Sequence, residues 1–149
     1  MSIPTTARQY SFPELGSYNN LVVQDVPVAA PRANEVLVKT HAVSLQFRDL
    51  LVASGAYANS QVFPSNLVPY SDMAGVIAVG EDVKQWKRGD RVSANFLLDR
   101  IYEEHNADII ASALGASTIP LLNQKPTPLS QSLVAIPDHL SYEEASTLP

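Results

Sequence analysis

The stretch Glu35-Val-Leu-Val-Lys-Thr-His-Ala-Val-Ser44 decides the fold class of this chain. Its even-numbered residues from 36 to 42 are mostly apolar, and its odd-numbered residues from 37 to 43 are mixed. A period of two predicts a β-strand that is apolar on one side. Met73-Ala-Gly-Val-Ile-Ala-Val-Gly80 predicts a second, more buried strand, in which Gly75 indicates a close backbone approach or a bulge.

Shorter elements surround these two strands. The pattern predicts strands at residues 7–12, 21–26, 91–94 and 133–136, helices at 45–54 and 108–114, and a further helix that starts at Ser141. Eleven prolines and six glycines favour strands and turns over long helices. We therefore expect a mainly β fold with short helices.

The predicted helices carry recognisable ends. Ser44 can cap the first helix and Gly55 can stop it. Ser141-Tyr-Glu-Glu144 has the spacing of a capping box, in which Ser141 and Glu144 each accept a backbone N–H of the other residue. Trp86 lies in a turn or hairpin and is expected to pack against the core.

The amino-acid composition excludes several classes of function. The chain has 149 residues, which is one domain on the usual prior, and no cysteine, which excludes disulfides and thiolate chemistry. A net charge of −5 argues against a nucleic-acid partner, and no apolar run is long enough to span a bilayer. The N-terminus lacks the apolar core of a secretory signal, so we expect a cytoplasmic protein. The three histidines, at 41, 105 and 139, share no metal-ligand spacing and are expected to be structural or exposed.

Three segments together carry a family resemblance: Ala42-Val-Ser-Leu-Gln-Phe-Arg-Asp-Leu-Leu-Val-Ala-Ser-Gly55, the run from Val68 to Val92, and the run from Leu133 to Pro149. In this order and spacing they resemble the N-terminal, GroES-like domain of the medium-chain dehydrogenase/reductase superfamily. The best match is its zinc-free branch, which is quinone-reductase-like or alcohol dehydrogenase-like. The resemblance implies a partly open β-barrel over residues 1–149.

In that family a Rossmann domain that binds NAD(P)H follows this domain, and substrate lies in the cleft between the two. Here the chain stops where the second domain would begin, and no glycine-rich Gly-x-Gly-x-x-Gly turn occurs. We therefore expect a truncated chain whose cofactor-binding domain is absent. NADP or NAD would serve the full-length family, and neither is expected to bind tightly to this chain alone.

The resemblance also argues against a metal. Zinc-dependent members ligate catalytic zinc through a Cys or Asp after the long strand and through a Gly-His-Glu motif. In this chain Gln46 stands at the first position, and Tyr70-Ser71-Asp72 replaces the motif. The four-cysteine structural lobe is missing as well. Catalytic zinc needs three protein ligands, so we expect no metal site.

Zinc-free relatives commonly read Ser-Leu-Asn-Tyr-Arg-Asp where this chain has Ser44-Leu-Gln-Phe-Arg-Asp49. By resemblance this turn faces the nicotinamide and the substrate. The predicted catalytic residues are Gln46, Arg48 and Asp49, and the predicted cleft residues are Phe47, Tyr57, Ser71 and Asp72. Phe47 lacks the phenol of the family pattern.

The charged residues could also have purely structural roles. Arg48 and Asp49 could form a solvated pair, or the arginine could tie its helix to a neighbouring strand. Asp72 could cap a turn.

Two functions follow. One is the substrate-side domain of a zinc-independent NAD(P)H-dependent oxidoreductase, with hydride transfer to or from a carbonyl, quinone or enone, inactive alone. Its partner would be a small molecule. The other is a truncated, non-catalytic GroES-like module that acts through protein contacts, as a homo-oligomer or through the surface that faces the missing domain.

Residues 116–132 depart from the family pattern through three prolines, so this segment is either an altered barrel strand or a loop.

Overall fold

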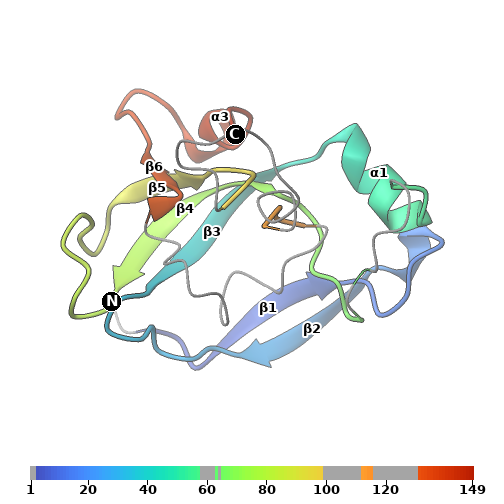
Figure 1. The fold of residues 1–149 in the computed structure, drawn as a ribbon, viewed down its shortest axis with the longest axis horizontal. Helices are drawn as coiled ribbons and strands as arrows, with labels where there is room; N and C mark the ends of the chain where they lie inside the picture. The colour runs from blue at the N-terminus through green and yellow to red at the C-terminus, as the bar shows by residue number, and fades with distance from the viewer. Residues whose placement is uncertain (1–2, 58–62, 64, 99–111, 116–130) are drawn as a thin grey trace.

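The alternating segment forms the longest strand of the computed structural model, which describes residues 3–57, 63, 65–98, 112–115 and 131–149 (Figure 1). In chain order the elements are β1 (Thr6–Ser11), the short 3-10 helix η1 (Tyr18–Asn20), β2 (Val22–Pro27), β3 (Val36–Ser44), α1 (Phe47–Ser54), β4 (Asp72–Val79), β5 (Arg91–Ala94), β6 (Leu133–Ala135) and α3 (Tyr142–Ala145). The prediction of a mainly β fold with short helices is confirmed.

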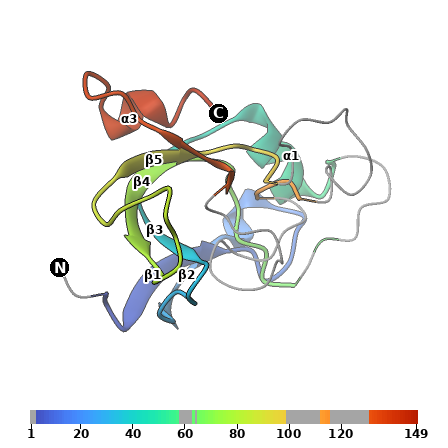
Figure 2. The same cartoon turned by 60° about the vertical axis from the view of Figure 1, so that its left-hand side comes forward.

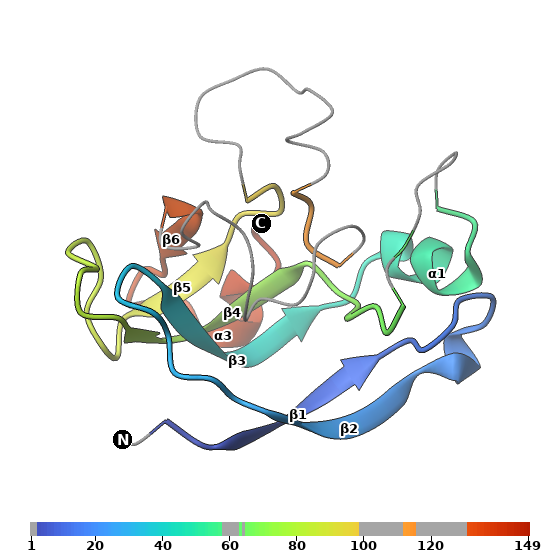
Figure 3. The same cartoon turned by 60° about the horizontal axis from the view of Figure 1, so that its bottom comes forward.

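The strands form two antiparallel sheets. β1 pairs with β2 in a two-stranded sheet, and β3, β4, β5 and β6 follow one another in a four-stranded sheet. Figures 1 and 2 show the β1–β2 pair on one side of the larger sheet and α3 on the other. Figure 3 brings the β1–β2 pair to the front. Within the described residues the strands do not close a barrel, which agrees with a partly open GroES-like architecture.

Gly75 of β4 lies against the backbone of β3. A Cβ at this position would lie 2.9 Å from the Lys39 carbonyl carbon and would also contact the Lys39 carbonyl oxygen. The register between the strands shifts between Thr40 and Ala42, which leaves His41 as the extra residue of a bulge. Both features expected of this glycine, close approach and a neighbouring bulge, are therefore present.

The main core lies on the inner face of the four-stranded sheet. Val36, Ile77 and Val92 are buried there together with Leu114, which lies outside the strands. Its full set of buried residues is Val36, Met73, Ile77, Val92, Ala94, Leu114 and Leu133. Trp86 packs against this cluster, as expected.

Helix α1 begins later than predicted. Its N-cap is Gln46, not Ser44, and its first residue is Phe47. The backbone N–H of Gln46 donates to the Asp49 carboxylate at 2.7 Å, and this bond fixes the N-cap two residues beyond the serine. Ser44 instead accepts a hydrogen bond from the Gln46 side-chain amide. Gly55 ends the helix in the left-handed conformation, as predicted.

The predicted capping box at Ser141 is confirmed. The Ser141 N–H donates to the Glu144 carboxylate at 2.8 Å, and the Glu144 N–H donates to the Ser141 hydroxyl at 3.1 Å. The hydrogen bond from the Ser141 N–H lowers the pKa of Glu144 below its usual value.

Two predictions fall wholly or partly outside the described residues. Residues 108–111 of the predicted helix lie outside the described residues, and residues 112–114 form a turn in which Ala113 makes a β-bridge to Leu97. The prediction of helix at 112–114 is therefore wrong, because this piece pairs with an extended segment. Most of 116–132, and His105, lie outside the described residues. Among the described helices, none has the length and apolar character needed to cross a membrane.

Candidate functional site

A cavity of about 450 Å³ opens between α1, β4 and the segment after β5. Its lining residues come from four separate parts of the chain: Gln46 and Arg48, Ser71 and Asp72, Asn95 with Phe96 and Leu97, and Pro149. Four of the residues predicted from sequence are thus brought together, although Gln46 and Asp72 are far apart in the chain. Asn95, Phe96, Leu97 and Pro149 were not predicted, because no sequence pattern singles them out.

Arg48 is the most constrained side chain of the cavity wall. Its Nη2 donates to the Leu114 carbonyl at 3.2 Å, and its guanidinium carbon lies 4.8 Å from the centre of the Phe96 ring and 5.7 Å from that of Tyr57. Both separations fall within the range of cation–π contacts. Its Nη1 is buried and has no hydrogen-bond partner among the described residues. The arginine thus ties α1 to two distant segments while it lines the cavity.

Asp49 lies behind the cavity wall. Its Oδ1 is 3.8 Å from Arg48 Nη2, and its side chain is 10% exposed. Burial raises the pKa of Asp49, and the charge of Asp72 adds to this, while the bond from the Gln46 N–H and the charge of Arg48 oppose it. The carboxyl group therefore serves as a helix cap and as the partner of Arg48.

Ser71 and Asp72 form a buried pair at the start of β4. The Ser71 hydroxyl donates to the Asp72 Oδ1 at 2.5 Å, and both residues are buried and line the cavity. Tyr70 precedes them with a φ of 73°, a conformation that costs a non-glycine residue about 1 kcal/mol or more. Burial raises the pKa of the Tyr70 phenol, with the charge of Asp49 next in effect.

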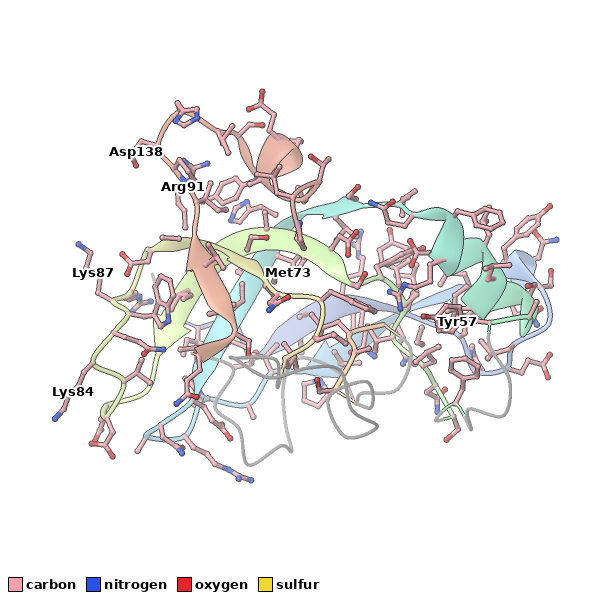
Figure 4. All side chains as sticks on the ribbon, turned by 45° about the horizontal axis from the view of Figure 1, so that its top comes forward. Tyr57, Met73, Lys84, Lys87, Arg91 and Asp138 are labelled. Atoms are coloured by element: carbon pink, nitrogen blue, oxygen red, sulfur yellow. The ribbon has the colours of Figure 1, made fainter. Side chains whose placement is uncertain are left out.

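The other predicted cleft residues lie away from the cavity lining. The Phe47 side chain is 73% exposed. Tyr57 contacts the Arg48 guanidinium and packs against the small core of Val52 and Leu67. Figure 4 shows Tyr57 beside the end of α1. Asp49 and Tyr57 thus contact Arg48, which lines the cavity.

The donor set of the cavity does not fit a catalytic zinc ion. Its polar side chains are two amides, a hydroxyl, a carboxylate and a guanidinium, whereas catalytic zinc takes three ligands from Cys, His, Asp or Glu. Across the described part of the chain, His, Asp and Glu do not gather in groups of three that could hold a metal ion.

The raised pKa of Asp49 predicts a specific pH dependence. In the folded state the ionised form is disfavoured, so the stability contribution is fully present below the ordinary pKa of about 3.9 and is lost as pH rises through the raised value. Asp49→Asn keeps an acceptor for the Gln46 N–H and does not titrate. We expect the stability of wild type relative to this variant to increase as pH falls through that window. Urea unfolding of both proteins at several pH values measures the difference; a constant difference, or one of opposite sign, contradicts the assignment.

Comparison with known proteins finds a matching domain family and several similar proteins. Residues 32–117 match the alcohol dehydrogenase GroES-like domain family. A zinc-type alcohol dehydrogenase-like protein of Schizosaccharomyces pombe is 35% identical over 138 residues, which cover 91% of this chain and 39% of that protein. The quinone oxidoreductase of Rattus norvegicus is 40% identical over 81 residues, which cover 53% of this chain and 24% of the rat protein.

Solved structures agree with the fold. A Sinorhizobium meliloti protein described as an alcohol dehydrogenase is 30% identical, with a TM-score of 0.78 over 99% of this chain and 44% of its own. The Escherichia coli quinone oxidoreductase, solved with NADPH, is 22% identical, with a TM-score of 0.65 over 95% of this chain and 37% of its own. The latter likeness concerns the fold alone. The chain spans well under half the length of each of these four proteins.

Proposed function

The chain belongs to the alcohol dehydrogenase GroES-like domain family, and from this premise we propose that it forms the substrate-side domain of a zinc-independent, NAD(P)H-dependent oxidoreductase. The substrate would be a small molecule with a carbonyl, quinone or enone group. The observation that carries the proposal is the convergence of Gln46, Arg48, Ser71 and Asp72 on one cavity.

The cavity has polar and apolar groups that could bind and orient a carbonyl substrate, while the cofactor would supply the redox chemistry. NAD(P)H, when bound, would supply or accept the hydride. Gln46 and Asn95 present amide groups that can donate to a carbonyl oxygen, and Phe96 and Leu97 provide an apolar wall that limits water. The Ser71–Asp72 pair lines the same cavity and would exchange a proton with that oxygen.

The sequence of the chain has no motif that would bind the dinucleotide part of the cofactor. Dinucleotides bind through a glycine-rich strand-to-helix turn at a helix N-terminus, and no Gly-x-Gly-x-x-Gly turn occurs in these 149 residues. We propose that the chain alone binds NAD(P)H weakly, is inactive alone, acts in the cytoplasm, and takes no nucleic acid or membrane as partner.

A titration of the isolated chain with NADPH, followed by calorimetry, tests the weak binding. We expect no saturable binding at micromolar concentrations, because one wall of a cleft buries too little of the cofactor. Micromolar affinity would sink this part of the proposal.

A chimera tests the activity. The chain replaces the aligned region of the Schizosaccharomyces pombe relative, and NADPH consumption is measured with a quinone, an enone and an aldehyde, before and after treatment with a zinc chelator. We expect turnover that the chelator leaves unchanged. Turnover lost with zinc and restored by adding it back would overturn the zinc-independent assignment, and a folded chimera that is inactive on every substrate would overturn the oxidoreductase assignment.

A second candidate is a non-catalytic module that acts through protein contacts. Its motivation is a row of exposed apolar side chains around the start of α1, at Val43, Leu45, Phe47 and Leu50. These side chains would serve as an association surface for a homo-oligomer or another protein. Size-exclusion chromatography of the chain, together with a hydrophobic dye, tests this candidate. A monomer that does not bind the dye would count against the association surface.

A further inference from the structure

His41 is placed by the bulge in β3. The register shift between Thr40 and Ala42 leaves His41 without a pairing partner on β4. Bulges of this kind redirect a side chain out of the regular alternation of a strand. The imidazole stacks on the ring of Tyr142, the first residue of α3, with the ring centres 4.5 Å apart and the planes at 12°.

Arg91 contacts the same ring from another strand. Its guanidinium carbon lies 4.7 Å from the centre of the Tyr142 ring, and its Nη2 donates to the Leu140 carbonyl at 2.5 Å. β3 and β5 are the two neighbours of β4 in the sheet. The Tyr142 ring therefore takes one contact from each of the two strands that flank β4. Figure 4 shows Arg91 next to the loop that carries Asp138, at the foot of α3.

The clamp, defined as His41, Tyr142 and Arg91, holds the last described segment of the chain. α3 has only four residues, and a helix of that length is not stable on its own. Beyond Tyr142, Ala145 is buried against Ala74 and Ile136. Pro149, the fourth residue after α3 ends, lines the cavity of the candidate site.

We propose that His41 and Arg91 are positioning residues of the candidate site: they clamp Tyr142 and so place Pro149 at the cavity wall. This role goes beyond the proposed function and needs only the cavity, whatever reaction occurs there. It also gives a use to His41, which the sequence marks only as structural or exposed. The imidazole acts through its flat face, so an aromatic ring of similar size can replace it.

The absence of cysteine from the chain supplies a sharp test. Ala145→Cys puts a single thiol in a position that is 2% exposed, under α3. Its rate of reaction with a soluble aromatic disulfide reports how often α3 leaves the sheet. We expect His41→Ala and Arg91→Met to raise this rate about fivefold to tenfold, in line with the strength of such ring contacts. We expect His41→Phe to keep it within about twofold of the parent.

A matched thiol separates local from global opening. Ala53→Cys lies buried in α1, at 3% exposed, far from the clamp in the fold. Its reaction rate should not change with His41→Ala. If Ala145→Cys does not fold, Ser146→Cys, which replaces another buried residue of the same segment, takes its place.

The positioning role has its own readout. The side-chain amides of Gln46 and Asn95 line the cavity and give separate signals in a nitrogen–proton NMR spectrum. We expect His41→Ala to shift both signals and His41→Phe to leave them in place. Unchanged thiol rates in His41→Ala and Arg91→Met, equal acceleration by His41→Ala and His41→Phe, or unmoved amide signals in His41→Ala would each overturn the proposal. None of these measurements uses cofactor or substrate, so their outcome is independent of the oxidoreductase assignment.

Discussion

Replacing Gly75 by alanine is expected to lower the free energy of unfolding by about 3 kcal/mol, at the upper end of the usual cost of overpacking a core. The new Cβ would lie 2.9 Å from the Lys39 carbonyl carbon and from Val38 Cγ1, and it would also contact the Lys39 carbonyl oxygen. The valine can turn away, but the backbone of β3 cannot move without breaking its pairing with β4. Urea unfolding followed by the fluorescence of Trp86, which packs on the main core, measures the loss.

Gly89→Ala is the control for Gly75→Ala. Gly89 has a φ of +95° but nothing within 4 Å of an added Cβ. Alanine there meets only the backbone cost of the left-handed region, about 1–2 kcal/mol. A loss at position 75 no larger than that at position 89 would contradict the close contact between β3 and β4.

Replacing Leu67 by alanine is expected to cost about 3 kcal/mol, within the range for emptying a buried leucine site. Leu67 is 1% exposed and packs with Val52 of α1 and with Tyr57. Its carbonyl also accepts the Phe12 N–H at 2.8 Å, so the residue joins the β1 region to the helix. Because Tyr57 in turn contacts Arg48, the cavity should loosen as well. Unfolding in urea gives the energy, and the Gln46 side-chain amide signal reports the cavity.

Leu50→Ala is the matched change for Leu67→Ala. Leu50 lies on the same helix as Val52 but is 57% exposed. Its truncation should stay within about 0.5 kcal/mol of wild type. Equal losses for the two leucines would show that the small core does not anchor α1.

Most of the strands could be predicted because their signal is local. The period of two in residues 35–44 and the apolar run of 73–80 each specify an extended segment without reference to the rest of the chain. The start of α1 could not be predicted, since the choice of Ser44 or Gln46 as the N-cap depends on where the Asp49 carboxylate points. Residues 112–114 form a turn because Ala113 pairs with Leu97, a contact between segments that no periodicity reveals.

The residues of the candidate site also differ in how far the sequence could predict them. Gln46, Arg48, Ser71 and Asp72 lie in motifs that could be recognised, and the fold brings them to one cavity. Asn95 and Pro149 lie in stretches whose sequence is unremarkable. Asn95 directly follows β5, and Pro149 reaches the cavity through the return of α3 to the sheet. Asp49 belongs to the motif yet lies behind Arg48, because it caps the helix.

The order of the strands has a kinetic consequence. β1 and β2 are close in sequence, so their pairing needs little loop closure, whereas β6 reaches β5 only after residues 95–132 have been brought back. The hydrogen bond from the Asn95 N–H to the Ser132 carbonyl and the contact of Pro149 with the cavity both depend on that return. During synthesis, therefore, the nascent chain can build its hairpins early, and its cavity is completed only after the last described residues leave the ribosome.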